Sequence, residues 1–311
     1  MKRPAVAATL AAALLFSQSV AAKADEPISI SGATFSWGMN PNISSIRSPA
    51  GYSRYLSAGD PGQQLGESVY ASKSGNVEIF QKRADGTVVS PTYATRADYV
   101  TNGGSQYFEF SNGTGQVNSD KSVDISWTGT VVVNEIGGVL SYSLSDPKLH
   151  VNADGTGRLS ATLAGWSVNR LDLSQRAYIP AIPEQTVADF ENVTLPSATG
   201  AQTLELNPTW SGVVAPVRKG QAEQVQTDNW GSWPADFVGF QNMTNLSSFY
   251  YSSGSHDENK VPLPITVKYE AGATKASEPV KAENGLWKIL KGIFGFPVWL
   301  VKQIIGLFGK D

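Results

Sequence analysis

The chain has no cysteine and only two histidines among its 311 residues. The absence of cysteine excludes disulfides, thiolate metal sites and a cysteine nucleophile. His150 lies between Leu149 and Val151, so in a strand it would point away from their face, and His256 lies in a polar loop. We therefore interpret both as ordinary surface residues. The sequence also lacks a G-x-S-x-G elbow, an H-E-x-x-H helix and a phosphate-binding glycine loop. We therefore expect a protein that is not an enzyme, with no catalytic residues and no metal site.

Charge is scarce as well. Charged residues make up 16% of the chain, and the formal net charge is −3. A balance this mild does not favour nucleic acid as a partner. Glycine, serine, threonine and asparagine are abundant instead, which is typical of exported proteins rich in β-structure.

The N-terminus resembles a secretory signal peptide. Basic residues at positions 2 and 3 precede a short apolar run over residues 5–16, and small residues follow as far as Ala24. This order predicts a cleaved signal helix over residues 1–24, with cleavage after Ala24 or, alternatively, after Ala22. The mature protein is then expected outside the cytoplasm, at the cell envelope or cell surface.

Alternation of apolar and polar residues dominates the chain from residue 28 to residue 269. The clearest run, residues 123–133, predicts one long half-buried strand, and residues 140–144, 159–163 and 261–269 alternate in the same way. Prolines between residues 178 and 217 predict irregular edge strands there. The fold class expected is all-β, with a single antiparallel sandwich or barrel-like domain over residues 25–271.

The C-terminal segment has a different pattern. Residues 272–284 are small, charged and unpatterned, which predicts a flexible linker. Residues 285–311 predict an amphipathic basic helix whose apolar face is about twice as wide as its polar face. Lys291, Lys302 and Pro297 make a spanning helix the weaker interpretation. A helix packed on the domain or on a second copy is the alternative to one lying at a membrane surface.

On the membrane interpretation, aliphatic and aromatic side chains contact the acyl region, and basic side chains contact the lipid head groups. The predicted membrane-contact residues are Trp287, Ile289, Leu290, Ile293, Phe294, Phe296, Leu300, Ile304, Ile305, Leu307 and Phe308. The predicted head-group contacts are Lys288, Lys291, Lys302 and Lys310. The expected partner is a membrane or outer-envelope lipid surface, with the protein peripherally attached.

Several blocks of the sequence, taken in order, resemble the HtaA domain family of actinobacterial envelope proteins, whose best-known members bind haem. No single block is specific, but the ordered set covers most of the predicted domain. The blocks are residues 35–39 (FSWGM), 55–59 (YLSAG), 113–127, 138–147, 230–234 (WGSWP) and 249–267.

The resemblance implies haem as the candidate cofactor, and haem or a haem-carrying protein as the candidate partner. In the family an axial tyrosine binds the iron and a later histidine supports it. Ile136 stands at the histidine's place in this sequence. The tyrosine's place is taken either by Pro49 or, after a longer insertion, by Tyr52 or Tyr55. Tyr55 is the preferred candidate ligand, with Arg54 as the candidate contact for a propionate.

Two functions remain open from the sequence. The first is an exported binding module that captures haem or another flat apolar ligand and is held at the membrane by its C-terminal helix. The alternative is a structural or membrane-active envelope protein in which the C-terminal helix carries the activity.

Overall fold

The computed structural model describes residues 26–46, 54–64, 66–169, 172–196 and 199–272. The predicted signal peptide, the linker after Gly272, the C-terminal helix and Tyr52 lie outside these ranges. Within them, no helix has the length and apolar character needed to cross a membrane.

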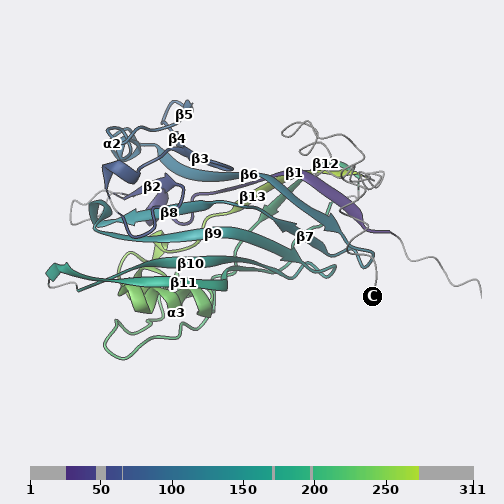
Figure 1. The fold of residues 1–311 in the computed structure, drawn as a ribbon. Coiled ribbons are helices and arrows are strands. Elements are labelled where there is room, and N and C mark those ends of the chain that lie inside the picture. The colour runs from purple at the N-terminus through teal and green to yellow at the C-terminus, as the bar shows by residue number, and fades with distance from the viewer. Residues whose placement is uncertain (1–25, 47–53, 65, 170–171, 197–198, 273–311) are drawn as a thin grey trace, which may run out of the picture.

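The described chain forms a mainly β domain with one large antiparallel sheet (Figure 1). The strands are β1 (Ile28–Trp37), β2 (Tyr55–Ala58), β3 (Lys73–Ser74), β4 (Val77–Lys82), β5 (Val88–Val89), β6 (Ser105–Val117), β7 (Val123–Ser126), β8 (Thr130–Glu135), β9 (Leu140–Val151), β10 (Gly157–Asn169), β11 (Asp172–Phe190), β12 (Gly200–Leu206) and β13 (Ile265–Gly272). The helices are α1 (Pro41–Ser44), α2 (Asp98–Thr101) and α3 (Ala235–Thr244), with 3-10 turns η1 (Glu67–Val69), η2 (Ile136–Gly138), η3 (Ser247–Phe249) and η4 (Asp257–Asn259).

The main path through the sheet runs β11-β10-β9-β7-β6-β1-β13-β12. The short strand β7 joins β6 to β9 over only part of their length. Beyond β7, the free edge of β6 pairs with β4, while that of β9 pairs with β8, which in turn pairs with β2. The sheet therefore divides into two branches beyond β7, within one continuous antiparallel sheet.

The prediction of one long strand over residues 123–133 is wrong. The chain leaves the sheet at Trp127 and returns at Thr130, so the segment forms two strands, β7 and β8. Both pair with β9, but on the other side β7 pairs with β6 and β8 with β2. Gly129 has a positive φ of 125°, which an L side chain rarely adopts. The Trp127 indole is buried and donates to the carbonyl of Ala33, 2.9 Å away, which holds the break against β1.

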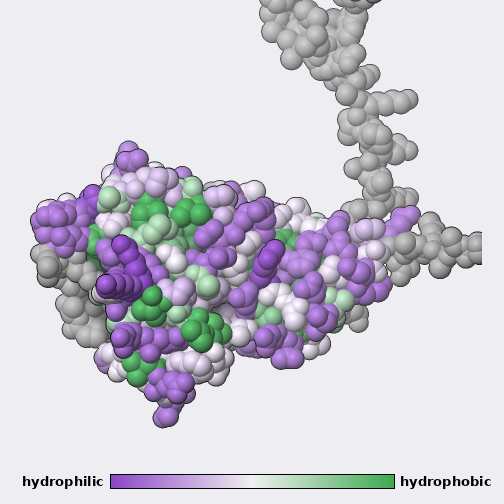
Figure 2. Space-filling view, turned by 90° about the horizontal axis from the view of Figure 1, so that it is seen from below, coloured by the Kyte–Doolittle hydropathy of each residue, from purple (hydrophilic) through white to green (hydrophobic). Residues whose placement is uncertain are grey.

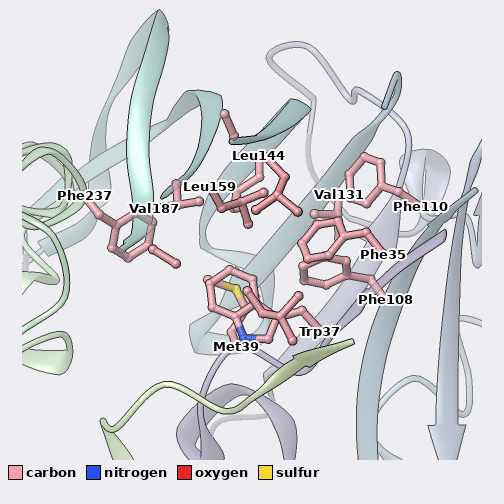
Figure 3. Packing of buried hydrophobic residues seen from close by; sticks show 14 of the residues in the cluster. Phe35, Trp37, Met39, Phe108, Phe110, Val131, Leu144, Leu159, Val187 and Phe237 are labelled. Atoms are coloured by element: carbon pink, nitrogen blue, oxygen red, sulfur yellow. The ribbon is translucent and has the colours of Figure 1, made fainter. Parts of the chain in front are cut away.

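Large aromatic side chains from the strands and from α3 pack together in the core (Figure 3). Phe35 and Trp37 of β1 pack with Phe108 and Phe110 of β6, with ring centroids 5.7–6.3 Å apart. Leu144 and Leu159 supply the aliphatic part from β9 and β10, as the alternation predicts. Residues that alternate on one face of each strand thus meet on the same side of the sheet.

Helix α3 has no counterpart in the sequence prediction. It packs beside β10 and β11, and Phe237 and Phe240 contact the Tyr142 ring at centroid distances of 6.0 and 6.3 Å (Figure 1). Apolar and polar residues of this helix, Gln241 and Thr244 among them, are buried alike. A helix without a polar face shows no period of 3.6 residues, so periodicity does not reveal it.

The prolines behave largely as expected, while the last strand is shorter than predicted. Pro180 and Pro183 lie in β11, the strand at one end of the sheet path.

Strand β13 begins at Ile265 rather than at residue 261. The segment before it turns toward the end of β1, where the Leu263 amide donates to the Met39 carbonyl.

Two glycine substitutions test the close approach of β6 to β7. A Cβ on Gly115 would lie 1.8 Å from the Asp124 carbonyl oxygen, so Gly115→Ala has to push two paired strands apart. We expect it to lower the free energy of unfolding by at least about 1–3 kcal/mol. A Cβ on Gly239 of α3 would meet no packed neighbour within 4 Å, so Gly239→Ala is the matched control and should stabilise the helix by about 1 kcal/mol. Urea denaturation measures both, and equal effects would contradict the tight pairing.

Candidate functional site

Strand β2 places Tyr55 on the side of the sheet that faces away from the main core. Alternate residues Leu56 and Ala58 belong to the core, whereas Tyr55 and Ser57 point into a second, smaller group of side chains. The Tyr55 side chain is buried, with 2% of the residue exposed. Its strand position is fixed by pairing with Asn134 of β8.

Three tyrosines and one arginine form this second group, which we call the tyrosine cluster: Tyr55, Tyr70, Tyr93 and Arg96. The ring centroid of Tyr55 lies 6.0 Å from that of Tyr70 and 6.3 Å from that of Tyr93. Tyr70 and Tyr93 are half-buried and contact each other at 5.6 Å. The guanidinium carbon of Arg96 lies 3.6 Å from the ring centroid of Tyr93 and 4.9 Å from that of Tyr55. One buried phenol is thus surrounded by two outer rings and a cation.

The cluster shifts the acidity of its phenols. Burial raises the pKa of Tyr55, and Tyr93 adds to the rise, while Arg96 opposes it by its charge and by a hydrogen bond. Burial also raises the pKa of Tyr70, to about 12. These two phenols are therefore neutral at physiological pH, and Arg96 is the group that favours a negative oxygen on Tyr55.

The turn η2 brings the predicted histidine position next to Tyr55. A Cβ on Gly138 would lie 2.4 Å from the Tyr55 hydroxyl, so the glycine lets the phenol oxygen approach the backbone. Ile136, the residue at the histidine's place in the family pattern, begins this turn with a φ of +49°. A positive φ is strained for a β-branched residue. The turn over residues 136–138 presents an isoleucine and two glycines, none of which has a polar side chain.

A buried ion pair fixes the start of β2 against the end of β8. Arg54 Nε lies 2.8 Å from a Glu135 carboxylate oxygen, and the side chains are 5% and 4% exposed. Burial works against the charge of Arg54, but Glu135 outweighs it and raises the pKa of the guanidinium. Arg54 also donates to the Asn42 carbonyl, 3.1 Å away. The guanidinium predicted to bind a propionate is thus held inside the domain in this structure; its role toward haem stays a prediction.

Other buried polar groups support the same strand. The Tyr99 hydroxyl donates to the Arg54 carbonyl at 2.8 Å, and Gln106 accepts from the Leu56 amide and donates to the Ile43 carbonyl. On the far side of Glu135, the Tyr250 hydroxyl lies 3.4 Å from the carboxylate. The start of β2 is therefore tied to α1, α2, β6 and β8 by hydrogen bonds.

The hollow beside Tyr55 is small. It measures about 10 Å³ and is lined by Tyr55, Ser57, Pro61, Gln64, Gly66, Val69, Tyr70, Val132 and Asn134. A volume of this size holds about one water molecule. Tyr70 and the residues before it cover the phenol, so a larger ligand reaches Tyr55 only after these side chains move.

The two histidines lie away from the tyrosine cluster. His150 is half-exposed on β9, where its Nδ1 lies 2.7 Å from Asp124, and a hydrogen bond with this carboxylate raises the pKa of His150. His256 is exposed in the loop before η4. Among the described residues no three histidines or carboxylates are grouped closely enough to hold a metal ion.

Comparison with known proteins supports the resemblance to the HtaA domain family. Residues 79–225 match the family model described as Htaa.

Solved structures of Corynebacterium glutamicum proteins are also similar to the chain. The C-terminal domain of HtaA is 15% identical, with a TM-score of 0.37, covering 79% of this chain and 99% of that domain. The N-terminal domain of HtaA is 13% identical, with a TM-score of 0.36 and coverages of 78% and 97%. Heme binding protein HtaB is 12% identical, with a TM-score of 0.35 and coverages of 79% and 96%. Similarity this distant carries no information about a ligand site, and no curated protein matches the sequence.

The structure places some of the candidate site residues together and adds residues that the sequence did not single out. It brings Tyr55 and Arg54 next to Glu135 and the turn that begins at Ile136. Tyr70, Tyr93 and Arg96 were not expected from the sequence. They lie in loops without strand or helix periodicity, and the only signal for the last two is an aromatic residue close to an arginine in residues 93–96 (YATR).

Removal of one member of the buried ion pair should destabilise the domain. Glu135→Gln leaves Arg54 charged, buried and without its carboxylate, and we expect a loss of about 3–5 kcal/mol in the free energy of unfolding. Glu78→Gln is the matched control, because Glu78 pairs with Lys73 at the exposed edge formed by β3 and β4. Such surface pairs contribute about 1 kcal/mol or less. Chemical denaturation measures the free energy of unfolding of both variants. Equal losses would show that the buried ion pair stabilises the domain no more than the surface pair does.

Proposed function

We propose that this protein is an HtaA-family binding module of the cell envelope that captures haem at Tyr55. The observation that carries the proposal is the position of the Tyr55 oxygen. It lies against the turn at residues 136–138, while the Tyr55 ring contacts the Arg96 guanidinium and the rings of Tyr70 and Tyr93. A phenolate oxygen is a known axial ligand of haem iron, and aromatic rings suit the flat apolar faces of a porphyrin.

The donor set fits ferric haem, whereas the closed hollow requires a change of conformation. Tyr70 lines the hollow and Tyr93 contacts the rings of Tyr55 and Tyr70, and both belong to loop segments rather than to the paired strands of the sheet. In the proposed capture step these rings move outward and line the porphyrin, while β2 keeps Tyr55 in place. Another flat apolar ligand with an acceptor for the phenol would use the same surface.

The arrangement of the strands suits a protein attached at one end. Ser29 of β1 pairs with Gly272 of β13, so both ends of the described domain leave it at the same place. The tyrosine cluster lies near the other end, where β2 and α2 are found (Figure 1). Strand β1, with ten residues, spans about 30 Å between the two ends. A membrane attachment through residues 285–311 would therefore hold the binding end away from the lipid.

The surface seen from the α3 side is mainly hydrophilic, with small separate hydrophobic patches (Figure 2). Val214 and Met243 are among the large exposed apolar residues of the domain.

A structural or membrane-active role is the second candidate. It is favoured by Ile136, which offers no hydrogen bond where the family has histidine, and by the small volume beside Tyr55. In that case the tyrosine cluster is a packing feature, and the C-terminal helix supplies the activity.

Titration with hemin separates the two candidates. We expect saturable binding to the purified domain, with the absorbance bands of a tyrosinate-ligated ferric haem, and loss of those bands in Tyr55→Phe. Tyr107→Phe is the matched control, because Tyr107 is half-buried on β6 and stacks on Phe80, outside the cluster. The absence of saturable binding, or bands that persist in Tyr55→Phe, would remove haem ligation by Tyr55.

Deletion of residues 285–311 tests the attachment. Each buried Leu- or Phe-sized side chain contributes about 1.5–3 kcal/mol to membrane binding, before the cost of ordering the segment is subtracted. We expect the truncated protein to leave the envelope fraction while still binding hemin. The proposal of a lipid anchor is wrong if the truncated and full-length proteins sediment equally with liposomes and with envelope fractions.

A further inference from the structure

One row of outward-facing side chains crosses the sheet from the point where the described chain ends. Gly272 of β13 pairs with Ser29 of β1, and the register continues from there through β6, β7, β9 and β10 to β11. Each member of the row lies next to a core residue of its own strand, so all of them point away from the core. The members of this outer row are Ser29, Gln116, Asp124, His150, Arg158 and Asp189.

The middle of the outer row lies in a hollowed part of the sheet surface. Residues of β6, β7, β9, β10 and β11 line a hollow of about 780 Å³, and a second hollow measures about 610 Å³. His150 and Arg158 line both, so the two hollows adjoin at the row. The side chains of His150 and Asp124 are 41% and 48% exposed. This face of the sheet is therefore open to an extended polar partner.

The charges of the outer row are only partly compensated. Asp124 lies 2.7 Å from His150, whereas Arg158 and Asp189 form no ion pair with any other residue that the structure describes. Burial and the nearby charge of Asp236 raise the pKa of Asp189, and Arg158 opposes the rise. Along the row the formal charge is negative at Asp124, positive at Arg158 and negative at Asp189, and the last two can accept a partner of opposite charge.

The distance of these charges from Gly272 follows from the strand order. Asp124, Arg158 and Asp189 lie three, five and six strands away from Gly272 along the register. Neighbouring strands are about 4.8 Å apart, so the three charges lie about 14, 24 and 29 Å from Gly272 along the sheet surface.

The sequence after Gly272 carries the opposite charges at matching distances. Lys275, Glu278 and Lys281 follow Gly272 in this order. An extended chain advances about 3.3 Å per residue, which places these residues about 10, 20 and 30 Å from Gly272. Positive, negative and positive charges thus meet negative, positive and negative ones, with offsets of about 4 Å or less that lysine and glutamate side chains can span.

We propose that residues 273–284 dock along the outer row, with Lys275 at Asp124, Glu278 at Arg158 and Lys281 at Asp189. The occupant of the hollowed face is then a segment of this same chain. The docked segment fixes the direction in which residues 285–311 leave the domain. A free segment of the same length has an end-to-end distance of about 20 Å and no fixed direction.

The covalent connection explains how weak contacts suffice. Exposed ion pairs contribute little one by one. The segment begins beside the row, however, so its effective concentration there is in the millimolar range. Salt screens such pairs, because the Debye length falls from about 10 Å at 0.1 M to about 3 Å at 1 M ionic strength. The docked state is therefore expected at low salt and lost at high salt.

The absence of cysteine permits a direct measurement of docking. Two introduced cysteines are the only attachment sites for spin labels in the full-length protein. One label is placed by Asn284→Cys and the other by Thr203→Cys, at an exposed position of β12 outside the outer row. Pulsed electron paramagnetic resonance then gives the distribution of distances between the labels. We expect a narrow distribution at low salt and a broad one at about 1 M salt. A broad distribution at low salt would overturn the proposal.

Charge reversal identifies the contact. Asp189→Lys and Lys281→Glu should each broaden the distribution, and the double variant should make it narrow again, because the ion pair re-forms with exchanged charges. Lys281→Glu lies outside the folded domain and tests the contact even if Asp189→Lys does not fold. Asp98→Lys is the matched control, since it makes the same change at the exposed start of α2 and should leave the distribution narrow. A distribution that stays narrow in Asp189→Lys and in Lys281→Glu would contradict docking at this row.

Docking onto a second copy is the competing arrangement. A mixture of two proteins, each carrying one of the two labels, shows a narrow distribution only if the segment of one chain binds another chain. That result would overturn docking within one chain. The outer row includes β7, which lies at the opposite end of the domain from β2 and α2 (Figure 1). The inference is therefore independent of hemin binding, and either proposal can fail without the other.

Discussion

The ion pair between Arg54 and Glu135 is the contact on which the geometry of the candidate site depends. Its two partners come from the residue before β2 and the last residue of β8, so it joins the two strands at the point where the chain turns into η2. Both charges are buried, and each is compensated by the other and by hydrogen bonds to the Asn42 carbonyl and the Tyr250 hydroxyl. An unpaired charge at this depth would be costly, which keeps the Tyr55 backbone and the 136–138 turn in a fixed relation.

The division of the sheet explains why such a site exists in a mainly β domain. At Gly129 the chain moves from β7 into β8, and β8 then pairs with β2 instead of continuing beside β6. This leaves β2 with one face on the core and the other toward the loops that carry Tyr70 and Tyr93. A regular sandwich strand would have turned that second face to solvent. The tyrosine cluster is therefore a consequence of the branch in the sheet.

Within the cluster, the roles of the residues differ by position. Tyr55 is buried and fixed by the sheet, whereas Tyr70, Tyr93 and Arg96 are half-buried on loops. The cluster thus combines one phenol fixed by the sheet with three side chains carried on loops.

Apolar alternation was enough to identify the β-class, most strands and the faces of β9 and β10, because burial on one side of a sheet imposes a period of two on the sequence. The ordered motifs also led to Tyr55 as the preferred candidate ligand and to Ile136 at the place of the family's histidine, and both assignments stay predictions. Only the tertiary structure decided the break at Gly129, the helix α3 and the meeting of Tyr55 with Tyr93 and Arg96. These features depend on packing between segments far apart in the chain, and such contacts leave no periodic signal in any one of them.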